Sequence, residues 1–200
     1  MGGAPNERGY YGPEQPRDLV MEPGSARAAL GERVYYGGVL NGVRAKHGRG
    51  PVMCERLGKV DLAGLSTDEE LMELCVQSYC VYLEEAWRAS RRCAEDDPKA
   101  QAIIIVDLDG LGYGLTILWY VSLVKRITAI GPPYYPEITR RVYIVRAPSA
   151  FQAIWAAVSV FLPQRTLDKV NVLGFSDYLD VLADEVEGGI EALPDFLGGG

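Results

Sequence analysis

The stretch APSAFQAIWAAVSVFLPQ, residues 147–164, contains no charged side chain and has a proline near each end. Its pattern predicts a helix over 149–162 that begins with a capping box formed by Ser149 and Gln152. At about 1.5 Å per residue this helix is roughly 21 Å long. That length is short of the hydrocarbon core of a bilayer, which a helix needs about 20 apolar residues to cross. The segment is therefore too short to cross a bilayer, and the fold has to bury it or place it against something apolar.

Both faces of the predicted helix are apolar. The large side chains Phe151, Ile154, Trp155, Val158, Phe161 and Leu162 share one face, and Ala153, Ala156, Ala157 and Val160 share the other. A helix that is apolar all round is either buried in the protein or in contact with another apolar medium. A core helix between two layers and a helix that covers an apolar ligand both fit this pattern.

The rest of the chain alternates between short apolar runs and longer amphipathic segments. Strands are predicted over 33–38, 51–58, 102–108, 141–145 and 169–174, and helices over 66–92, 115–130, 149–162 and 176–186. The run AIIIVDL at 102–108 is continuous, as in a strand that is buried on both faces. Strands that alternate with helices of these lengths indicate an α/β fold with a mainly parallel sheet.

Composition fits one globular domain, because 48% of the 200 residues are apolar and 24% are charged. Residues 1–32 are rich in glycine and proline and lack an apolar period, so we expect a disordered arm there and one domain over 33–200. The four cysteines show no Cys-x-x-Cys spacing, which favours buried reduced thiols over a metal site.

Charge is distributed unevenly along the chain. Residues 120–170 contain seven basic and two acidic side chains, whereas residues 171–200 contain seven acidic and no basic ones. The net charge of −7 argues against nucleic acid as the main partner. A basic zone that includes an uncharged helix favours an anionic membrane surface or an anionic ligand.

The stretch IIIVDLDGLGYG, residues 103–114, permits two enzyme interpretations. A dinucleotide-binding loop requires a third glycine at position 115, and the chain has leucine there. The spacing of Asp107 and Asp109 resembles haloacid dehalogenase phosphatases, in which two such carboxylates act as nucleophile and acid/base with Mg²⁺. That family carries the motif near its start, and its following Ser/Thr motif has no counterpart here. The simpler alternative is that both aspartates end a strand and bind the backbone of the next turn.

Six motifs together resemble the CRAL-TRIO lipid-binding domain, and most closely its phosphatidylinositol transfer branch. They are GRGPVMCERLGK (48–59), YYPE (134–137), RAPSAF (146–151), TLDK (166–169), VNVLG (170–174) and LPDFLGG (193–199). The resemblance implies a mainly parallel sheet with flanking helices and an apolar cavity for lipid acyl chains. It makes the helix over 149–162 the gate of that cavity, lined by the large side chains named above.

The same resemblance implies a monomer without enzyme activity, cofactor or metal, which binds a phospholipid and exchanges it between membranes. The expected ligand is phosphatidylinositol, with Glu137, Thr166 and Lys169 at the inositol phosphate. The expected location is cytoplasmic and peripheral at membranes with an anionic surface. A tocopherol, a retinoid or a sterol-like ligand is an alternative cargo, and a phosphatase that uses Asp107 and Asp109 is an alternative function.

The chain also departs from the family pattern. Relatives that bind phosphatidylcholine carry hydroxyl groups where this chain has Ala102 and Ile104, so we expect weak phosphatidylcholine binding. Arg146 stands where the family has asparagine. The helical region that precedes the domain in the family and its C-terminal extension are both missing, so we expect a fragment or a shortened product.

Overall fold

The computed structural model describes residues 37–59, 68–95, 97–111, 117–135 and 137–200. The arm predicted over 1–32 lies outside these residues. The predicted domain over 33–200 is described from Gly37 onward, apart from the gaps between these ranges.

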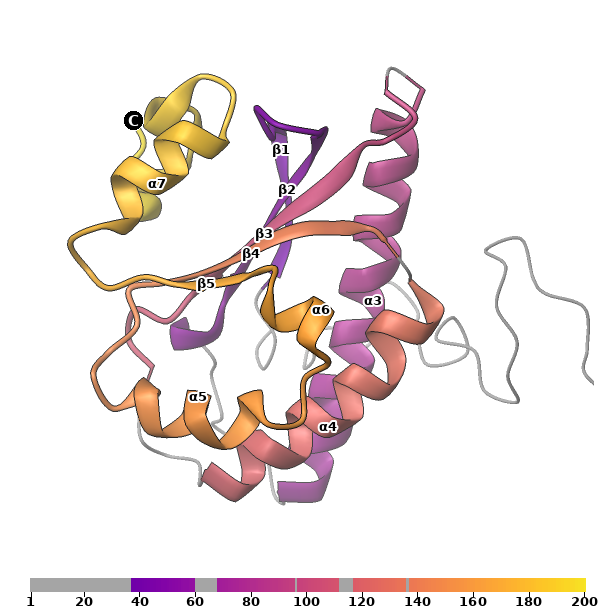
Figure 1. Ribbon diagram of the computed structural model, residues 1–200, viewed down its shortest axis with the longest axis vertical. Helices are drawn as coiled ribbons and strands as arrows, with labels where there is room; N and C mark the ends of the chain where they lie inside the picture. The colour runs from indigo at the N-terminus through magenta and orange to yellow at the C-terminus, as the bar shows by residue number, and fades with distance from the viewer. Residues whose placement is uncertain (1–36, 60–67, 96, 112–116, 136) are drawn as a thin grey trace, which may run out of the picture.

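Five strands form one sheet in the order β1-β2-β3-β4-β5. They are β1 (Gly37–Arg44), β2 (Arg49–Arg56), β3 (Gln101–Asp107), β4 (Thr139–Val145) and β5 (Val170–Val172). β1 and β2 pair antiparallel, and all the other neighbours pair parallel. Figure 1 shows the resulting twisted sheet. The predicted α/β class with a mainly parallel sheet is confirmed.

Strand β1 overlaps the strand predicted over 33–38 at Gly37 and Gly38 and continues to Arg44, while residues 33–36 lie outside the described residues. It contains Gly37, Gly38 and an Asn41-Gly42 pair, all of which have low β propensity. Pairing with β2 overrides that propensity, since Gly37 lies opposite Glu55 and Val39 lies opposite Met53. A positive φ of 79° at Gly42 accompanies a shift of the register before Arg44.

The helices lie on both faces of this sheet. They are α3 (Asp68–Cys93), α4 (Ile117–Tyr134), α5 (Phe151–Ser159), α6 (Gln164–Leu167) and α7 (Tyr178–Glu185), with 3-10 turns at Leu57–Lys59, Gly189–Ala192 and Asp195–Leu197. Helices α3, α4 and α5 lie on one side of the sheet, and α7 with the C-terminal turns lies on the other (Figure 1). None of the described helices combines the length and apolar character that crossing a bilayer requires.

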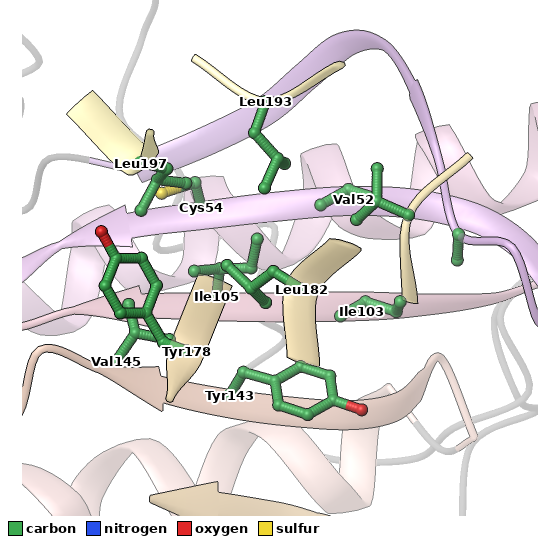
Figure 2. Packing of buried hydrophobic residues seen from close by; sticks show 12 residues of the cluster. Val52, Cys54, Ile103, Ile105, Tyr143, Val145, Tyr178, Leu182, Leu193 and Leu197 are labelled. Carbon is green, nitrogen blue, oxygen red and sulfur yellow. The ribbon is translucent and has the colours of Figure 1, made fainter. Parts of the chain in front are cut away.

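The sheet face toward α7 is a conventional hydrophobic core. Its sheet residues are Val52, Cys54, Ile103, Ile105, Tyr143 and Val145, and they pack against Tyr178, Leu182, Leu193 and Leu197 of the C-terminal segment (Figure 2). All of these side chains are buried. This side of the sheet is therefore closed by the protein's own residues.

All four cysteines are buried and none of them forms a disulfide, as the sequence predicts. Burial raises the pKa of the Cys54, Cys75 and Cys80 thiols to about 12. These thiols therefore remain protonated near neutral pH and behave as small apolar side chains.

Candidate functional site

Helix α5, which the sequence predicts as a cover over the sheet, is shorter than its pattern indicates. It runs from Phe151 to Ser159 rather than over 149–162. The amide of Phe151 donates to the Pro148 carbonyl at 2.8 Å, and the amide of Leu162 donates to the Ser159 carbonyl at 3.1 Å. These are three-residue bonds, so a tight turn at each end replaces α-helix close to the two prolines.

The predicted capping box is wrong. The residue at the N-cap position is Ala150, and no side chain caps it. Ser149 contributes its backbone instead, since its carbonyl accepts the Gln152 amide at 3.2 Å. The tight turn after Pro148 takes the place of a side-chain cap.

The two faces of α5 differ as the sequence predicts. Phe151 and Val158 are buried, and Ile154 and Trp155 are half-buried toward the sheet. The Phe151 and Trp155 rings stack with their centroids 6.3 Å apart. On the other face Ala153 and Ala156 are exposed, and Val160 just past the helix is 74% exposed. The helix therefore presents large apolar groups inward and small ones outward.

The sheet beneath α5 is only partly covered. Side chains alternate between faces along a strand, so neighbours in β3 can be compared directly. Ile103 and Ile105 on the α7 face are fully buried, whereas Ile104 and Val106 on the opposite face are half-buried. Val142 of β4 and Val170 of β5 are also half-buried on this face. Ile104 packs with Met53, Tyr82 and Ala86 toward α3, and Ile144 is buried, so the incompletely covered apolar surface beneath α5 consists of Val106, Val142 and Val170.

A pocket of about 250 Å³ opens between α5 and the edge strand β5. Its lining includes Pro148, Phe151, Trp155, Val172 and Leu173. Ligand pockets usually have volumes of about 300–1,000 Å³, so this pocket alone is too small for a diacyl lipid. The chamber predicted for two acyl chains stays a prediction.

The segment after α5 is held to α4 by a contact that the sequence does not reveal. Phe161 is 43% exposed, and the Lys125 ammonium nitrogen lies 4.0 Å from the centroid of its ring. A cation over an aromatic face at an exposed site contributes about 0.5–1 kcal/mol. Leu162, the last predicted gate residue, is half-buried.

Two of the predicted headgroup residues meet at the start of β4 and β5. The Lys169 Nζ atom lies 3.8 Å from Oε2 of Glu137 and donates a hydrogen bond to the Thr139 carbonyl at 2.8 Å. Glu137 is an exposed non-glycine residue with a φ of 59°, and its carbonyl accepts a hydrogen bond from the Gln101 side chain at 2.8 Å. A residue held in this left-handed region is strained, and strain of this kind is concentrated at functional sites.

Thr166, the third predicted residue, lies on the short helix α6 one turn before Lys169. Its carbonyl accepts the Lys169 amide at 3.0 Å. The Arg141 guanidinium donates to the Asp168 carbonyl at 2.8 Å, so β4 also holds this turn through a side chain. The backbone that carries Lys169 is therefore fixed from two sides.

Asp107 and Asp109 are engaged at the opposite, carboxyl ends of the strands. Oδ1 of Asp107 accepts the Asp109 amide at 3.0 Å, as the strand-end alternative predicts. Arg146 contacts both carboxylates, with two hydrogen bonds to Asp107 of 2.9 and 2.5 Å and a distance of 3.3 Å to Oδ2 of Asp109. Asp107 is 1% exposed. A buried carboxylate bound by a bidentate guanidinium is unavailable as a nucleophile, which disfavours the phosphatase alternative.

Sequence reasoning identified Arg146 only as a departure and missed this cluster. The available signal was an acidic pair at the end of one predicted parallel strand and a lone arginine at the end of the next. The carboxyl ends of parallel neighbours meet at one edge of a sheet, and here Asp107 lies opposite Val145.

The comparisons with known proteins agree with this geometry. The family model described as the CRAL/TRIO domain matches residues 38–199. The chain is 35% identical over 161 residues to the phosphatidylinositol/phosphatidylcholine transfer protein SFH11 of Arabidopsis thaliana, covering 77% of this chain and 40% of that protein. It is 31% identical over 157 residues to the Sec14 cytosolic factor of Schizosaccharomyces pombe, covering 74% of this chain and 51% of that protein.

A solved structure supports the same fold. The crystal structure of Sfh5 superposes with a TM-score of 0.58 at 14% identity, over 83% of this chain and 55% of that one. The chain spans about half or less of the length of the two curated relatives above.

Proposed function

The chain belongs to the CRAL/TRIO domain family, and from this premise we propose that it binds a phospholipid and exchanges it between membranes without catalysing a reaction. The observation that carries the proposal is the half-buried apolar floor beneath an uncharged helix. Val106 of β3, Val142 of β4 and Val170 of β5 form this floor, and a domain of this size normally has closed core beneath a covering helix.

The acyl chains of the ligand account for that floor. A diacyl lipid has about 30 methylene groups, and exposing them to water costs roughly 24 kcal/mol. A carrier has to replace that water with apolar side chains. The inward face of α5, with Phe151, Ile154 and Trp155, and the floor opposite it supply such a surface.

Phosphatidylinositol is the proposed ligand because of Lys169. An ammonium group has three donors. One is used on the Thr139 carbonyl, and one points toward Glu137. The third can bind a phosphate oxygen, and the exposed Glu137 carboxylate can accept a hydrogen bond from an inositol hydroxyl.

Phosphatidylcholine is a poorer ligand in this proposal, although the names of some relatives include it. Ala102 is fully buried in a cluster with Met53, Tyr82 and Ala86, so it cannot reach a ligand. Ile104 is half-buried against the same cluster and has no hydrogen-bonding group. A phosphocholine group would therefore find no partner at these positions.

Exchange requires α5 to meet a membrane, and its outer surface suits one. Val160 and Phe161 are exposed, as is Leu118 of α4, and the exposed cations Lys125 and Arg126 lie on α4. Apolar side chains next to basic ones bind anionic lipid surfaces. We therefore place the protein peripherally at membranes, and in the cytoplasm because its relative from Schizosaccharomyces pombe is named a cytosolic factor.

The test is to purify the chain, identify the lipids that copurify with it by mass spectrometry, and measure exchange between vesicles. We expect bound phosphatidylinositol and faster exchange of phosphatidylinositol than of phosphatidylcholine. Absence of both copurified lipid and exchange would contradict the proposal. Equal displacement by a tocopherol, a retinoid or a sterol would favour the alternative cargo.

A further inference from the structure

Arg146 lies in the short segment of chain that connects β4 to α5. It follows Val145, the last residue of β4, and precedes the Ala147-Pro148 segment that leads into α5. Its φ is 53°, in the left-handed region that non-glycine residues rarely adopt. The chain direction thus changes at this residue, and a compensating interaction has to hold it there.

The side chain of Arg146 supplies that interaction. Its guanidinium binds Asp107 of β3 through two hydrogen bonds and lies 3.3 Å from Asp109 in the turn that follows. Its central carbon lies 6.0 Å from the centroid of the Tyr178 ring at the start of α7. Burial lowers the pKa of Arg146, but the hydrogen bond and charges of Asp107 and the charge of Asp109 more than offset this and raise it. The arginine is therefore permanently charged and tied to three elements.

The other end of α5 is held by apolar packing rather than by an ion pair. Val158 is buried there and α4 packs against the helix. Just past the helix, however, Val160 and Phe161 are exposed, and the contact between Phe161 and Lys125 is a surface contact. This end leads through α6 to Lys169, the proposed headgroup site. The end fixed by the ion pair lies at the carboxyl ends of the strands, and the end held by apolar packing leads to their amino ends.

We propose that Arg146 is a positioning residue in lipid exchange: it is the fixed pivot about which α5 lifts from the sheet. The gate then opens first at its Phe161 end, which is the end that leads to the proposed headgroup site. This inference rests on the proposed function. The two hydrogen bonds from the Arg146 guanidinium to Asp107 determine both the position of the pivot and the fraction of time that α5 is lifted. The ammonium of a lysine has the same charge but cannot reproduce that geometry.

Hydrogen–deuterium exchange of the delipidated chain tests the pivot without any lipid. A nine-residue helix lifted from its contacts is too short to keep its hydrogen bonds in water. The exchange rate of the peptide that covers 151–162 therefore reports lifting. Arg146→Lys should raise that rate about tenfold, because one point charge replaces two directed hydrogen bonds.

The matched control is Arg140→Lys. Arg140 also lies on β4 and pairs with a carboxylate, Glu185 of α7, but it lies far from α5 along the strand. This variant should leave the 151–162 peptide unchanged. If the exchange rate of the 151–162 peptide rises equally in both variants, the change is general destabilisation and the pivot is overturned. The same holds if, in Arg146→Lys, the exchange rate of the β3 peptide over 101–107 rises as much as that of the 151–162 peptide. No change at 151–162 would overturn it too.

Retention of bound lipid separates this inference from the proposed function. With fluorescent phosphatidylinositol loaded, Arg146→Lys should shorten the half-life of spontaneous release about tenfold and Arg140→Lys should not. If the native chain binds no lipid but α5 still exchanges selectively in Arg146→Lys, the proposed function fails while the pivot holds. Unchanged release in a lipid-binding chain would contradict the pivot alone.

Discussion

Lys169 is the residue on which the headgroup assignment depends. Its side chain is 31% exposed, and its contacts with Glu137 and the Thr139 carbonyl lie close to the surface. Surface ion pairs contribute only about 0–1 kcal/mol to stability. A charged hydrogen bond to a phosphate contributes more to binding, about 1.5–3 kcal/mol. Ligand binding and folding should therefore respond differently when this side chain is removed.

Lys169→Ala should lower phosphatidylinositol exchange by about tenfold to a hundredfold and leave the thermal unfolding midpoint nearly unchanged. Arg165→Ala is the control, because it removes an equally charged, exposed side chain from the neighbouring helix α6. Vesicle exchange assays and calorimetry measure the two effects. Similar losses in both variants would indicate general attraction to anionic vesicles and would reject the headgroup role.

At the level of single residues, the sequence predicts contacts that are local and misses those that depend on the order of strands. Asp107 bonding its own turn follows from a two-residue spacing. Its partner Arg146 is distant in sequence, and the pair exists because β3 and β4 are adjacent and in register. Similarly, the contact of Lys125 with Phe161 requires α4 and α5 to pack together, which no local pattern encodes.

At the level of elements, the outer surface of α5 leads to a prediction about membrane binding that can be tested separately from headgroup binding. Val160→Asp replaces a side chain that is 74% exposed, so stability should change by no more than about 0.5 kcal/mol. Binding to anionic vesicles should fall about tenfold or more. The reason is that the variant loses an apolar side chain whose burial in the membrane contributes about 1.5 kcal/mol to binding. It also adds a negative charge that the anionic membrane surface repels.

Asn41→Asp is the matched control for Val160→Asp. It adds the same charge at an exposed position of β1, away from α5. Cosedimentation with vesicles that contain anionic lipid gives the bound fraction for each variant. If both variants bind less by the same factor, net charge rather than the surface of α5 determines vesicle binding.

The bounds of helices and strands were predictable where apolar runs are continuous. They were poorly predictable where prolines or pairing with a neighbouring strand determine them. Strand β3 matches the predicted run to within one residue at each end, because helices cover both faces of the sheet and its central strand carries apolar side chains on each face. Helix α5 is shorter at both ends because the prolines impose tight turns. Strand β1 continues to Arg44, beyond the end predicted at residue 38, since Asn41 and Gly42 join a strand only through pairing with β2.

At the level of the whole molecule, the two faces of the sheet have different tasks. The α7 face holds a filled core that includes Leu182, Leu193 and Leu197, and this core stabilises the domain whether or not a ligand is present. The opposite face also has buried side chains, but Val106, Val142 and Val170 beneath α5 are only half-buried, and in the proposed function a lipid occupies the space next to them. A domain built in this way should lose stability unequally when matched side chains are shortened on the two faces.

Two valines of β4 provide the comparison. Val145 is fully buried on the α7 face, and Val142 is half-buried beneath α5. In delipidated protein, Val145→Ala should lower the free energy of unfolding by about 1.5–3 kcal/mol, the contribution of a fully buried valine side chain. Val142→Ala should cost less than half as much, because a side chain facing incompletely filled space loses fewer contacts. Urea unfolding of both variants measures the difference. Equal costs would mean that both faces are filled core, and the argument for a ligand space beneath α5 would fail.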